Sequence, residues 1–343
     1  MPLPLLVFAS VLTLAPPADT EYRQPQLATE GHRVGLTFGA KNSIYYAESA
    51  DNGAHFSEPV KVTDADQLAL GRHRGPRLVI LPDALVISAV IGGSQSGNLV
   101  ALRSTDRGRT WTRTATINDA PHSAREGLHA MAADSKGNLF AAWLDDRDQG
   151  KRLYGARSTD GGRTWSKNVL IYASPDGTIC QCCHPSLAFD AQGQVWVMWR
   201  NALGGSRDLY VAHSRDGAAF TGVQKLGDGT WPLQACPMDG GALAFDRDAQ
   251  PVTAWRRGEE VFLDRPGQPE KLLGKGKDVA MTTAPDGVYA VWTGPQGLTA
   301  LTPKSSSVEI LAPKGAFPQL TRLPNGKVLA AWEDGGQLRF QVL

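Results

Sequence analysis

All four cysteines of the chain fall in two short segments, and each segment also holds other groups that bind soft metals. The segments are TICQCCHPSL (178–187) and QACPMDGG (234–241). Thiolate, thioether and imidazole ligands together suit Cu(I), and they suit Zn(II) less well because of the thioether. The residue types therefore indicate a soft-metal site, with copper as the first cofactor to consider. The candidate ligands are Cys180, Cys182, Cys183, His184, Cys236 and Met238.

Two other states of these cysteines stay open. An even number of cysteines favours two disulfides in an oxidising compartment, although three cysteines within four residues force a tight local bridge or a strained vicinal one. The run from Cys180 to His184 also satisfies the Cys-x-x-Cys-His pattern of covalent haem attachment, with Met238 available as a second axial ligand. The sequence alone does not decide among disulfide, metal and haem.

A second group of charged residues lies in GRHRGPR (71–77) and AREGLHAMA (124–132). Arginine binds a carboxylate through two parallel hydrogen bonds, so these segments suit a small anionic ligand. His73 between two arginines is hard to explain as a core residue, whereas His129 on an apolar strand is typical of a buried histidine. Arg125 and Glu126 could instead form an ion pair. The ligand-binding candidates are Arg72, His73, Arg74, Arg125 and His129.

These residues must be positioned by a repeated structure, because one turn pattern recurs four times. The copies are SADNGAHF (49–56), STDRGRTW (104–111), STDGGRTW (158–165) and SRDGAAF (214–220). Each copy follows an alternating strand segment. The Asp and Ser side chains can form hydrogen bonds within the turn, the Gly supplies a positive φ, and the aromatic residue packs beneath. We therefore expect each copy to connect two strands of a hairpin.

A second repeat pairs an apolar strand with an aromatic strand, as in PSLAFDAQGQVWVMW (185–199) and PQLTRLPNGKVLAAW (318–332). Its copies recur at intervals of 38 to 57 residues, which is close to the period of propeller blades. The sequence predicts an all-β fold, a β-propeller of six or seven four-stranded blades in one domain (19–343), with residues near Tyr22 closing the last blade. The unit starts are Pro25, Pro76, Gly127, His184, Gly240, Asp278 and Phe317.

The residues just before each inner strand of a propeller surround one mouth of the central channel. Aligning the inner strands places there the arginine and histidine segments, Asp239, and the cysteines of the fourth and fifth units. We therefore expect the chemistry of this protein to collect at that mouth.

The repeated Ser-x-Asp-x-Gly-x-Thr-Trp pattern resembles the Asp-box of the sialidase superfamily over nearly the whole chain. The resemblance implies a propeller fold, and in sialidases three arginines that hold the substrate carboxylate, the first in a Phe/Tyr-Arg-Ile-Pro motif. Tyr22-Arg23-Gln24-Pro25 is similar to that motif and lies directly before the first inner strand. The catalytic candidates that the resemblance implies are Arg23, Arg200 and Arg256 or Arg257 as carboxylate ligands and Glu126 or Asp239 as acid/base.

The chain departs from the sialidase pattern in its nucleophile. Sialidases use a Tyr paired with a Glu, but Tyr289 lies in the strand segment GVYAVW and is expected in the core. Asp51, the nearest acid after Arg23 in a recognisable motif, belongs to the first Asp-box turn. These departures weaken the case for sialidase activity.

The composition bears on the partners of the protein, and the N-terminal segment bears on its location in the cell. The 343 residues carry a formal net charge of +1, which gives no general attraction to nucleic acid or to an anionic membrane. The apolar run from Leu3 to Leu14, followed by small residues and proline, predicts a signal peptide over residues 1–18 and a secreted or periplasmic protein.

Two hypotheses follow from the sequence. In the first, the propeller binds a small anionic ligand or glycan beside a metal or redox cluster of cysteine, methionine and histidine. In the second, it is an exo-sialidase-type glycoside hydrolase that acts on sialic acid or a related acidic sugar, with Arg23 holding the carboxylate. The missing Tyr–Glu pair favours the first hypothesis.

Overall fold

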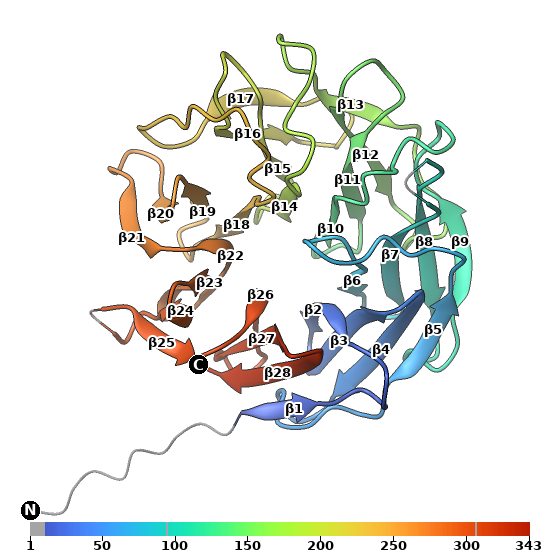
Figure 1. Cartoon of the computed structure of the whole chain (residues 1–343). Helices are drawn as coiled ribbons and strands as arrows, with labels where there is room; N and C mark the ends of the chain where they lie inside the picture. The colour runs from blue at the N-terminus through green and yellow to red at the C-terminus, as the bar shows by residue number, and fades with distance from the viewer. Residues whose placement is uncertain (1–10, 94, 306) are drawn as a thin grey trace, which may run out of the picture.

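The chain folds into a ring of seven four-stranded blades around a central channel (Figure 1). The computed structural model describes residues 11–93, 95–305 and 307–343, and no helix occurs in these residues. The prediction of an all-β propeller is confirmed, and the blade number is seven. Within the described residues no helix is long and apolar enough to cross a membrane.

The first four blades follow one another in chain order. Blade one holds β2 (Arg23–Glu30), β3 (Arg33–Ala40), β4 (Ser43–Ser49) and β5 (Val60–Asp64). Blade two holds β6 (Arg77–Ile80), β7 (Leu85–Ile91), β8 (Asn98–Ser104) and β9 (Thr112–Thr116). Blade three holds β10 (His129–Ala133), β11 (Leu139–Asp145), β12 (Arg152–Ser158) and β13 (Val169–Tyr172). Blade four holds β14 (Ser186–Phe189), β15 (Val195–Arg200), β16 (Leu209–Ser214) and β17 (Thr221–Lys225).

The last three blades complete the ring. Blade five holds β18 (Gly241–Phe245), β19 (Pro251–Arg257), β20 (Glu260–Asp264) and β21 (Lys271–Lys275). Blade six holds β22 (Lys277–Ala284), β23 (Gly287–Gly294), β24 (Gly297–Leu301) and β25 (Glu309–Ala312). Blade seven holds β26 (Ala316–Arg322), β27 (Val328–Asp334), β28 (Gln337–Val342) and β1 (Leu12–Leu14).

Blade seven is closed by the beginning of the chain, but not by the residues that the sequence suggested. Leu12–Leu14 pair antiparallel with Leu338–Phe340 as the outermost strand (Figure 1). The expectation for residues near Tyr22 is corrected, because Tyr22 is buried against Phe38 and only its backbone N–H bonds Gly336. The first ten residues of the expected signal peptide lie outside the described residues.

Each blade packs against its neighbours through buried side chains of its second strand. In blades three to seven this strand carries a tryptophan that is at most 2% exposed: Trp143, Trp199, Trp255, Trp292 and Trp332. Burying so large an apolar surface is the main stabilising contribution in such a fold. The inner strands are thereby held in fixed positions around the channel.

The four Asp-box copies connect the third and fourth strands of blades one to four, as predicted. In blade two, the Ser104 hydroxyl donates to Asp106 at 2.8 Å, and the Gly108 N–H donates to the Ser104 oxygen at 2.9 Å. Hydrogen bonds from Thr110 and Ser104 lower the pKa of Asp106 to about 2. Gly108 has φ of +82°, where a Cβ would be strained. These residues stabilise the hairpin and lie away from the channel pocket.

Candidate functional site at the channel mouth

Three blades place a side chain in the channel through a β-bulge at the start of the inner strand. The pairing register shifts there in β2, β22 and β26. Gln24, Asp278 and Phe317 lie at these bulges, with φ of 54°, 56° and 51°. A bulge redirects a side chain, and a left-handed backbone at a residue other than glycine is costly and clusters at functional sites. The backbone is therefore strained at the three positions whose side chains it directs into the channel.

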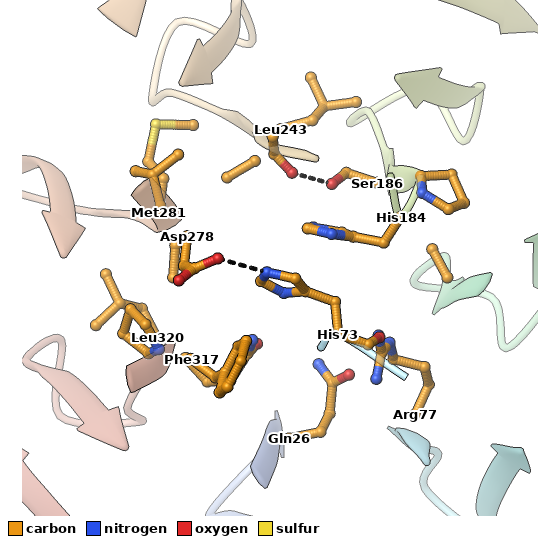
Figure 2. A pocket seen from close by; sticks show the side chains of 18 of the residues that line it. Gln26, His73, Arg77, His184, Ser186, Leu243, Asp278, Met281, Phe317 and Leu320 are labelled. Carbon is orange, nitrogen blue, oxygen red and sulfur yellow. Dashed lines mark hydrogen bonds and ion pairs between the residues drawn. The ribbon is translucent and has the colours of Figure 1, made fainter. Parts of the chain in front are cut away.

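The bulges and the neighbouring loops enclose a pocket of about 280 Å³ at one end of the channel (Figure 2). Ligand pockets usually have volumes of about 300–1,000 Å³, so this one lies just below that range. Its volume suits a small ligand. Its polar lining includes Gln26, His73, Arg77, His184, Ser186 and Asp278.

His73 is held by residues from three other blades. Its Nε2 bonds Asp278 Oδ1 at 2.8 Å, its ring stacks on His184 at 4.3 Å, and Phe317 meets it edge-on at 5.1 Å (Figure 2). A carboxylate can only accept, so this bond assigns the proton to Nε2 and leaves Nδ1 as a proton acceptor. The arrangement is that of a histidine base oriented by a carboxylate.

A second carboxylate lies behind this pair. Asp239 is 1% exposed, and its Oδ2 accepts from the backbone N–H of Asp278 at 3.2 Å. Burial, together with the charge of Asp278, raises the pKa of Asp239. The Asp239 carboxyl therefore tends to keep a proton inside the cluster. Ligand atoms of His73, Asp239 and Asp278 lie within 4.8 Å of one another, which is also close enough for them to share a divalent cation.

His184 forms the adjoining part of the pocket wall as a neutral ring. Burial, with the positive charges of Arg77 and Arg200, holds its pKa well below the usual value. Its Nδ1 is enclosed and has no hydrogen-bond partner among the described residues. A side chain at Gly240 would reach within 2.7 Å of the ring, so this glycine makes room for His184.

Arg77 is a cation in the pocket wall without a carboxylate partner among the described residues. Its guanidinium donates to the backbone carbonyls of His73 at 2.6 Å and of Gly75 and Pro76 at 3.2 Å. Burial lowers the pKa of Arg77 to about 10. A partly desolvated, unpaired arginine favours an anionic group in the pocket.

Arg23, the first expected carboxylate ligand, lies beside the mouth and not in this pocket. Its Nε donates to Glu333 at 3.2 Å and its guanidinium pairs with Glu21 at 3.4 Å. Arg23 instead lines a separate, shallower groove with Lys41 and Leu70. Two acidic neighbours already balance its charge.

Arg200 and Arg256 are structural links between blades four and five. Arg200 is 1% exposed and donates to the carbonyls of Asp239 at 3.0 Å, Arg207 at 2.7 Å and Arg256 at 2.9 Å. Arg256 donates to Gly258 and lies 3.9 Å from Asp239 Oδ2. Both guanidinium groups lie 5.2 Å from the Trp231 ring. Neither arginine lines the pocket, but both support Asp239 from behind.

The remaining charged candidates of blades two and three form a network outside the pocket. Glu126 pairs with Lys151 at 2.9 Å and with Arg74 at 3.8 Å, and Arg125 pairs with Asp146 at 2.6 Å. The alternative considered above, an ion pair between Arg125 and Glu126 themselves, does not form. Arg72 is exposed next to His73.

His129 points into blade two, where its Nε2 lies 3.0 Å from the Ser88 hydroxyl. It is 0% exposed, and burial lowers its pKa to about 3. It is therefore the buried histidine that its apolar strand indicated, and it does not face the pocket.

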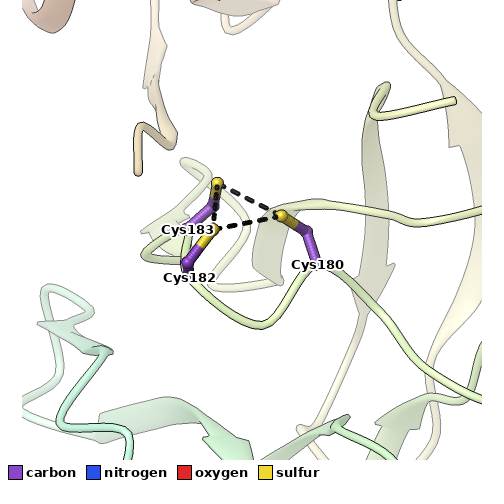
Figure 3. Close-up of side chains that lie close together, drawn as sticks. All are labelled: Cys180, Cys182 and Cys183. Atoms are coloured by element: carbon purple, nitrogen blue, oxygen red, sulfur yellow. Dashed lines mark hydrogen bonds between the residues drawn. The ribbon is translucent and has the colours of Figure 1, made fainter. Parts of the chain in front are cut away.

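The three cysteines before His184 point toward one another, as Figure 3 shows. The Sγ–Sγ distances are 3.4 Å for Cys180–Cys183, 3.8 Å for Cys180–Cys182 and 4.0 Å for Cys182–Cys183. All four cysteines are free thiols, with Cys236 exposed, so the structure contains neither of the two disulfides considered above. Met238 packs against the buried trio.

This arrangement does not fit covalent haem. The three sulfurs converge within one buried cluster, whereas two thioether links to a macrocycle require thiols that face it separately. The His184 ring, which would be the axial ligand, stacks on His73 in the channel wall. A single small cation suits the converging sulfurs better.

Sequence reasoning located the mouth but missed several residues that line it. His73 and His184 were singled out, while Gln24, Arg77 and Asp278 were not. Asp278 stands at a unit start and could have been found by the same alignment that selected His184. Arg77 lies inside GRHRGPR, where nothing in the sequence distinguishes it from Arg72 and Arg74.

Comparison with known proteins agrees with this fold. The family model described as BNR repeat-like domain matches residues 31–174 and 84–230, which together span more than half of the chain. The chain belongs to this family. The resemblance to Asp-box propellers is thereby confirmed. A curated relative from Neosartorya fischeri, a probable oligoxyloglucan-reducing end-specific xyloglucanase, is 24% identical over 319 residues. The match covers 80% of this BNR repeat chain but 36% of the relative.

Solved structures of carbohydrate-active enzymes share the fold of this BNR repeat protein. The Penicillium chrysogenum alpha-L-arabinanase, solved with arabinobiose, has a TM-score of 0.61 at 15% identity, covering 97% of this chain and 98% of its own. The GH93 alpha-L-arabinofuranosidase of Fusarium graminearum has a TM-score of 0.59 at 15% identity, covering 98% and 97%. A PL25 ulvan lyase has a TM-score of 0.60 at 12% identity, covering 96% of both chains. Identities this low show the fold alone, and this fold is shared with glycoside hydrolases.

Proposed function

We propose that the channel-mouth pocket binds one acidic sugar residue of a glycan and that the protein hydrolyses the glycosidic bond at that residue. The observation that carries the proposal is the His73–Asp278 hydrogen bond in the wall of a pocket that also holds the unpaired Arg77. A base oriented by a carboxylate beside an anion-binding cation is the minimum equipment for acid–base cleavage of an acidic sugar.

Three residues of the pocket and one residue behind it have roles in this proposal. Arg77 binds the sugar carboxylate. Nδ1 of His73 takes a proton from the attacking water, and Asp278 stabilises the resulting imidazolium. The bond between the anomeric carbon and the glycosidic oxygen breaks as the water attacks, and the leaving oxygen takes its proton from solvent at the mouth. Asp239, whose pKa is raised, lies behind Asp278 and limits the negative charge of the cluster.

The hydrolysis proposed here differs from sialidase chemistry in its nucleophile. The described residues that line the pocket include no tyrosine, and Tyr289 is 1% exposed with its hydroxyl bonded to Asp286 at 2.8 Å. A sialic acid remains one of the acidic sugars to test, but cleavage would have to proceed through the His73–Asp278 pair rather than through a tyrosine.

One observation favours elimination as a second candidate reaction. The pocket lining contains a single carboxylate, Asp278, which His73 already engages, while hydrolysis usually uses two acting carboxyl groups. In an elimination, Nδ1 of His73 would remove the proton next to the carboxylate that Arg77 neutralises. The electron pair of that C–H bond would form a double bond to the neighbouring ring carbon, the C–O bond at that carbon would break, and the leaving oxygen would take a proton from solvent water.

The test is an activity screen of the wild-type protein and of Asp278→Asn on polysaccharides and aryl glycosides of uronic and sialic acids. Hydrolysis releases a reducing end alone, and elimination also produces the ultraviolet absorbance of an unsaturated uronate. The proposal expects turnover that falls at least about a hundredfold in Asp278→Asn. Binding without turnover would show a propeller that binds anionic glycans and does not cleave them. Equal turnover by the wild type and Asp278→Asn would refute the assigned site.

We also propose that the protein is exported, on the basis of the apolar run from Leu3 to Leu14. Cleavage near Ala15 or Ala18 would remove β1 and leave blade seven with three strands. N-terminal sequencing of the protein from extracytoplasmic fractions tests this proposal, and recovery of an uncleaved chain in the cytoplasm alone would contradict it.

A further inference from the structure

We propose that Cys180, Cys182 and Cys183 bind one soft d¹⁰ cation, Zn(II) or Cu(I), as a tris-thiolate site behind the channel wall. This inference uses different residues from the proposed glycan chemistry and does not rest on it. The chain has one further cysteine, Cys236.

The sulfur triangle has the dimensions of a metal site. Tetrahedral zinc with Zn–S bonds of about 2.3 Å requires Sγ–Sγ edges of about 3.8 Å. The three observed edges are 3.4, 3.8 and 4.0 Å, so a cation can enter with sulfur movements of a few tenths of an ångström. Three thiols that only packed as small apolar groups would have no reason to direct all their sulfurs to one point.

The site is enclosed and built on fixed backbone. The three cysteines are 2%, 6% and 2% exposed, which shields a bound cation from water and chelators. The N–H of Cys180 donates to the Arg200 carbonyl at 3.1 Å, and the N–H of Ile179 donates to the Lys151 carbonyl at 3.0 Å. Blades three and four thus hold the segment that presents the sulfurs, and such preorganisation favours metal binding.

The segment that precedes β18 supplies the fourth side of the site. Met238 packs directly against the three cysteines, and its φ of 59° shows a strained backbone at this point. The exposed Cys236 lies two residues before Met238. It is near enough to the Cys182 thiol to contribute to the raised pKa of that thiol. A Met238 ligand would favour Cu(I) and a Cys236 ligand would favour Zn(II), because thioethers bind copper(I) well and zinc poorly.

A bound cation would also act on the channel. Cys183 directly precedes His184, whose ring stacks on His73. The cation would anchor the segment that carries His184 and would link blade four to the segment before blade five. Metal binding would then stabilise the fold, because a cation that binds only the folded chain raises its stability.

The experiment uses the full chain, purified with reductant and without added metal. One arm adds Zn(II) and the other adds Cu(I), each against a chromophoric chelator, and Co(II) serves as a spectroscopic probe. We expect one equivalent of cation, a thiolate-to-cobalt charge-transfer band, and protection of three thiols from alkylation in the intact mass. Serine at position 180, 182 or 183 should lower the affinity at least about tenfold.

Two further variants identify the fourth ligand, and a measurement of folding separates loss of metal binding from loss of structure. Cys236→Ser and Met238→Leu identify the fourth ligand, since only loss of a ligand lowers the affinity and changes the cobalt spectrum. Circular dichroism reports whether each variant folds. If Cys183→Ser does not fold, the cobalt spectrum and the alkylation pattern of the wild-type protein decide whether the three cysteines bind the cation. Reduced, folded wild-type protein that binds neither cation at one equivalent would overturn the proposal. Two disulfides in the protein isolated from its native compartment would also overturn it.

Discussion

The hydrogen bond between His73 and Asp278 spans the central channel. His73 precedes the inner strand of blade two and Asp278 belongs to the inner strand of blade six, 205 positions later in the chain. The two blades are not neighbours in the ring, so the bond joins opposite parts of the channel wall (Figure 1). Both residues have a left-handed backbone, with φ of 67° and 56°. Two strained residues that meet across a channel indicate selection for the site they form.

Replacing His73 should abolish most of the activity without unfolding the protein. His73→Gln removes the base, and the expected loss in kcat is about a hundredfold or more with little change in KM. Steady-state kinetics on the best substrate of the screen measures the loss. The control His32→Gln changes an exposed histidine of the β2–β3 hairpin and should keep wild-type rates. A His73→Gln enzyme with wild-type kcat would exclude His73 as the base.

Arg77 should decide the preference for acidic ligands. Arg77→Gln removes the positive charge, and its shorter side chain also loses the guanidinium bonds to the carbonyls of His73 and Pro76. We expect binding of a uronic acid to weaken at least about tenfold, while its neutral sugar counterpart binds the variant and the wild type equally. Calorimetric titration with both sugars measures this. Arg113→Gln on the exposed outer strand β9 is the matched control. Equal weakening for both sugars would point to a structural role of Arg77.

How much of this site the sequence predicts can be seen from single residues. His73 and His184 follow from the alignment of inner strands, because the repeat fixes which positions face the mouth. Arg23 matches a motif, but its guanidinium pairs with Glu333 of the last blade and is not available to a ligand. The sequence does not show this pair, because only closure of the ring brings the two residues together. Gln24 and Phe317 reach the pocket through bulges, and no local pattern in the sequence marks those bulges. The Asp-box turns were predictable because all of their bonds are local.

Stability should fall as the pH decreases, because His129 is buried as a neutral ring. Burial, with the charge of Arg77, lowers its pKa to about 3 from an ordinary value of 6.5. Above pH 6.5 the His129 ring is unprotonated in both the folded and the unfolded chain, so it does not reduce the free energy of unfolding. Between about 6.5 and 3 the unfolded chain binds the proton first, and this histidine alone costs up to about 1.4 kcal/mol per pH unit. His184, whose pKa is also lowered, adds to the loss in the same direction.

Urea unfolding across this pH range measures that dependence. His129→Gln should be less stable near neutral pH, because it disturbs the bond to Ser88, but its stability should decrease less steeply on acidification. The exposed His32 serves again as the control position, and His32→Gln should retain the wild-type slope. An unchanged slope in His129→Gln would show that the ring is not kept neutral by burial.

The Asp-box glycines should be needed for blade packing as well as for the turn. Gly162 has φ of +82°, and a Cβ there would lie 2.9 Å from Val86 of the preceding blade. Gly162→Ala should cost about 1–3 kcal/mol, from backbone strain and from the contact together. Gly177→Ala provides the comparison, since Gly177 has φ of +84° with no atom within 4 Å of the added Cβ. Equal losses in the two variants would mean that strain alone matters.

The most direct test of the channel-mouth site is the crystal structure of the protein soaked with a uronic acid monosaccharide. The expected result is one sugar ring in the pocket of about 280 Å³, with its carboxylate on Arg77 and a hydroxyl within hydrogen-bond distance of His73. A sugar bound instead in the groove beside Arg23, or on no part of the channel mouth at concentrations that saturate binding in solution, would contradict the assignment.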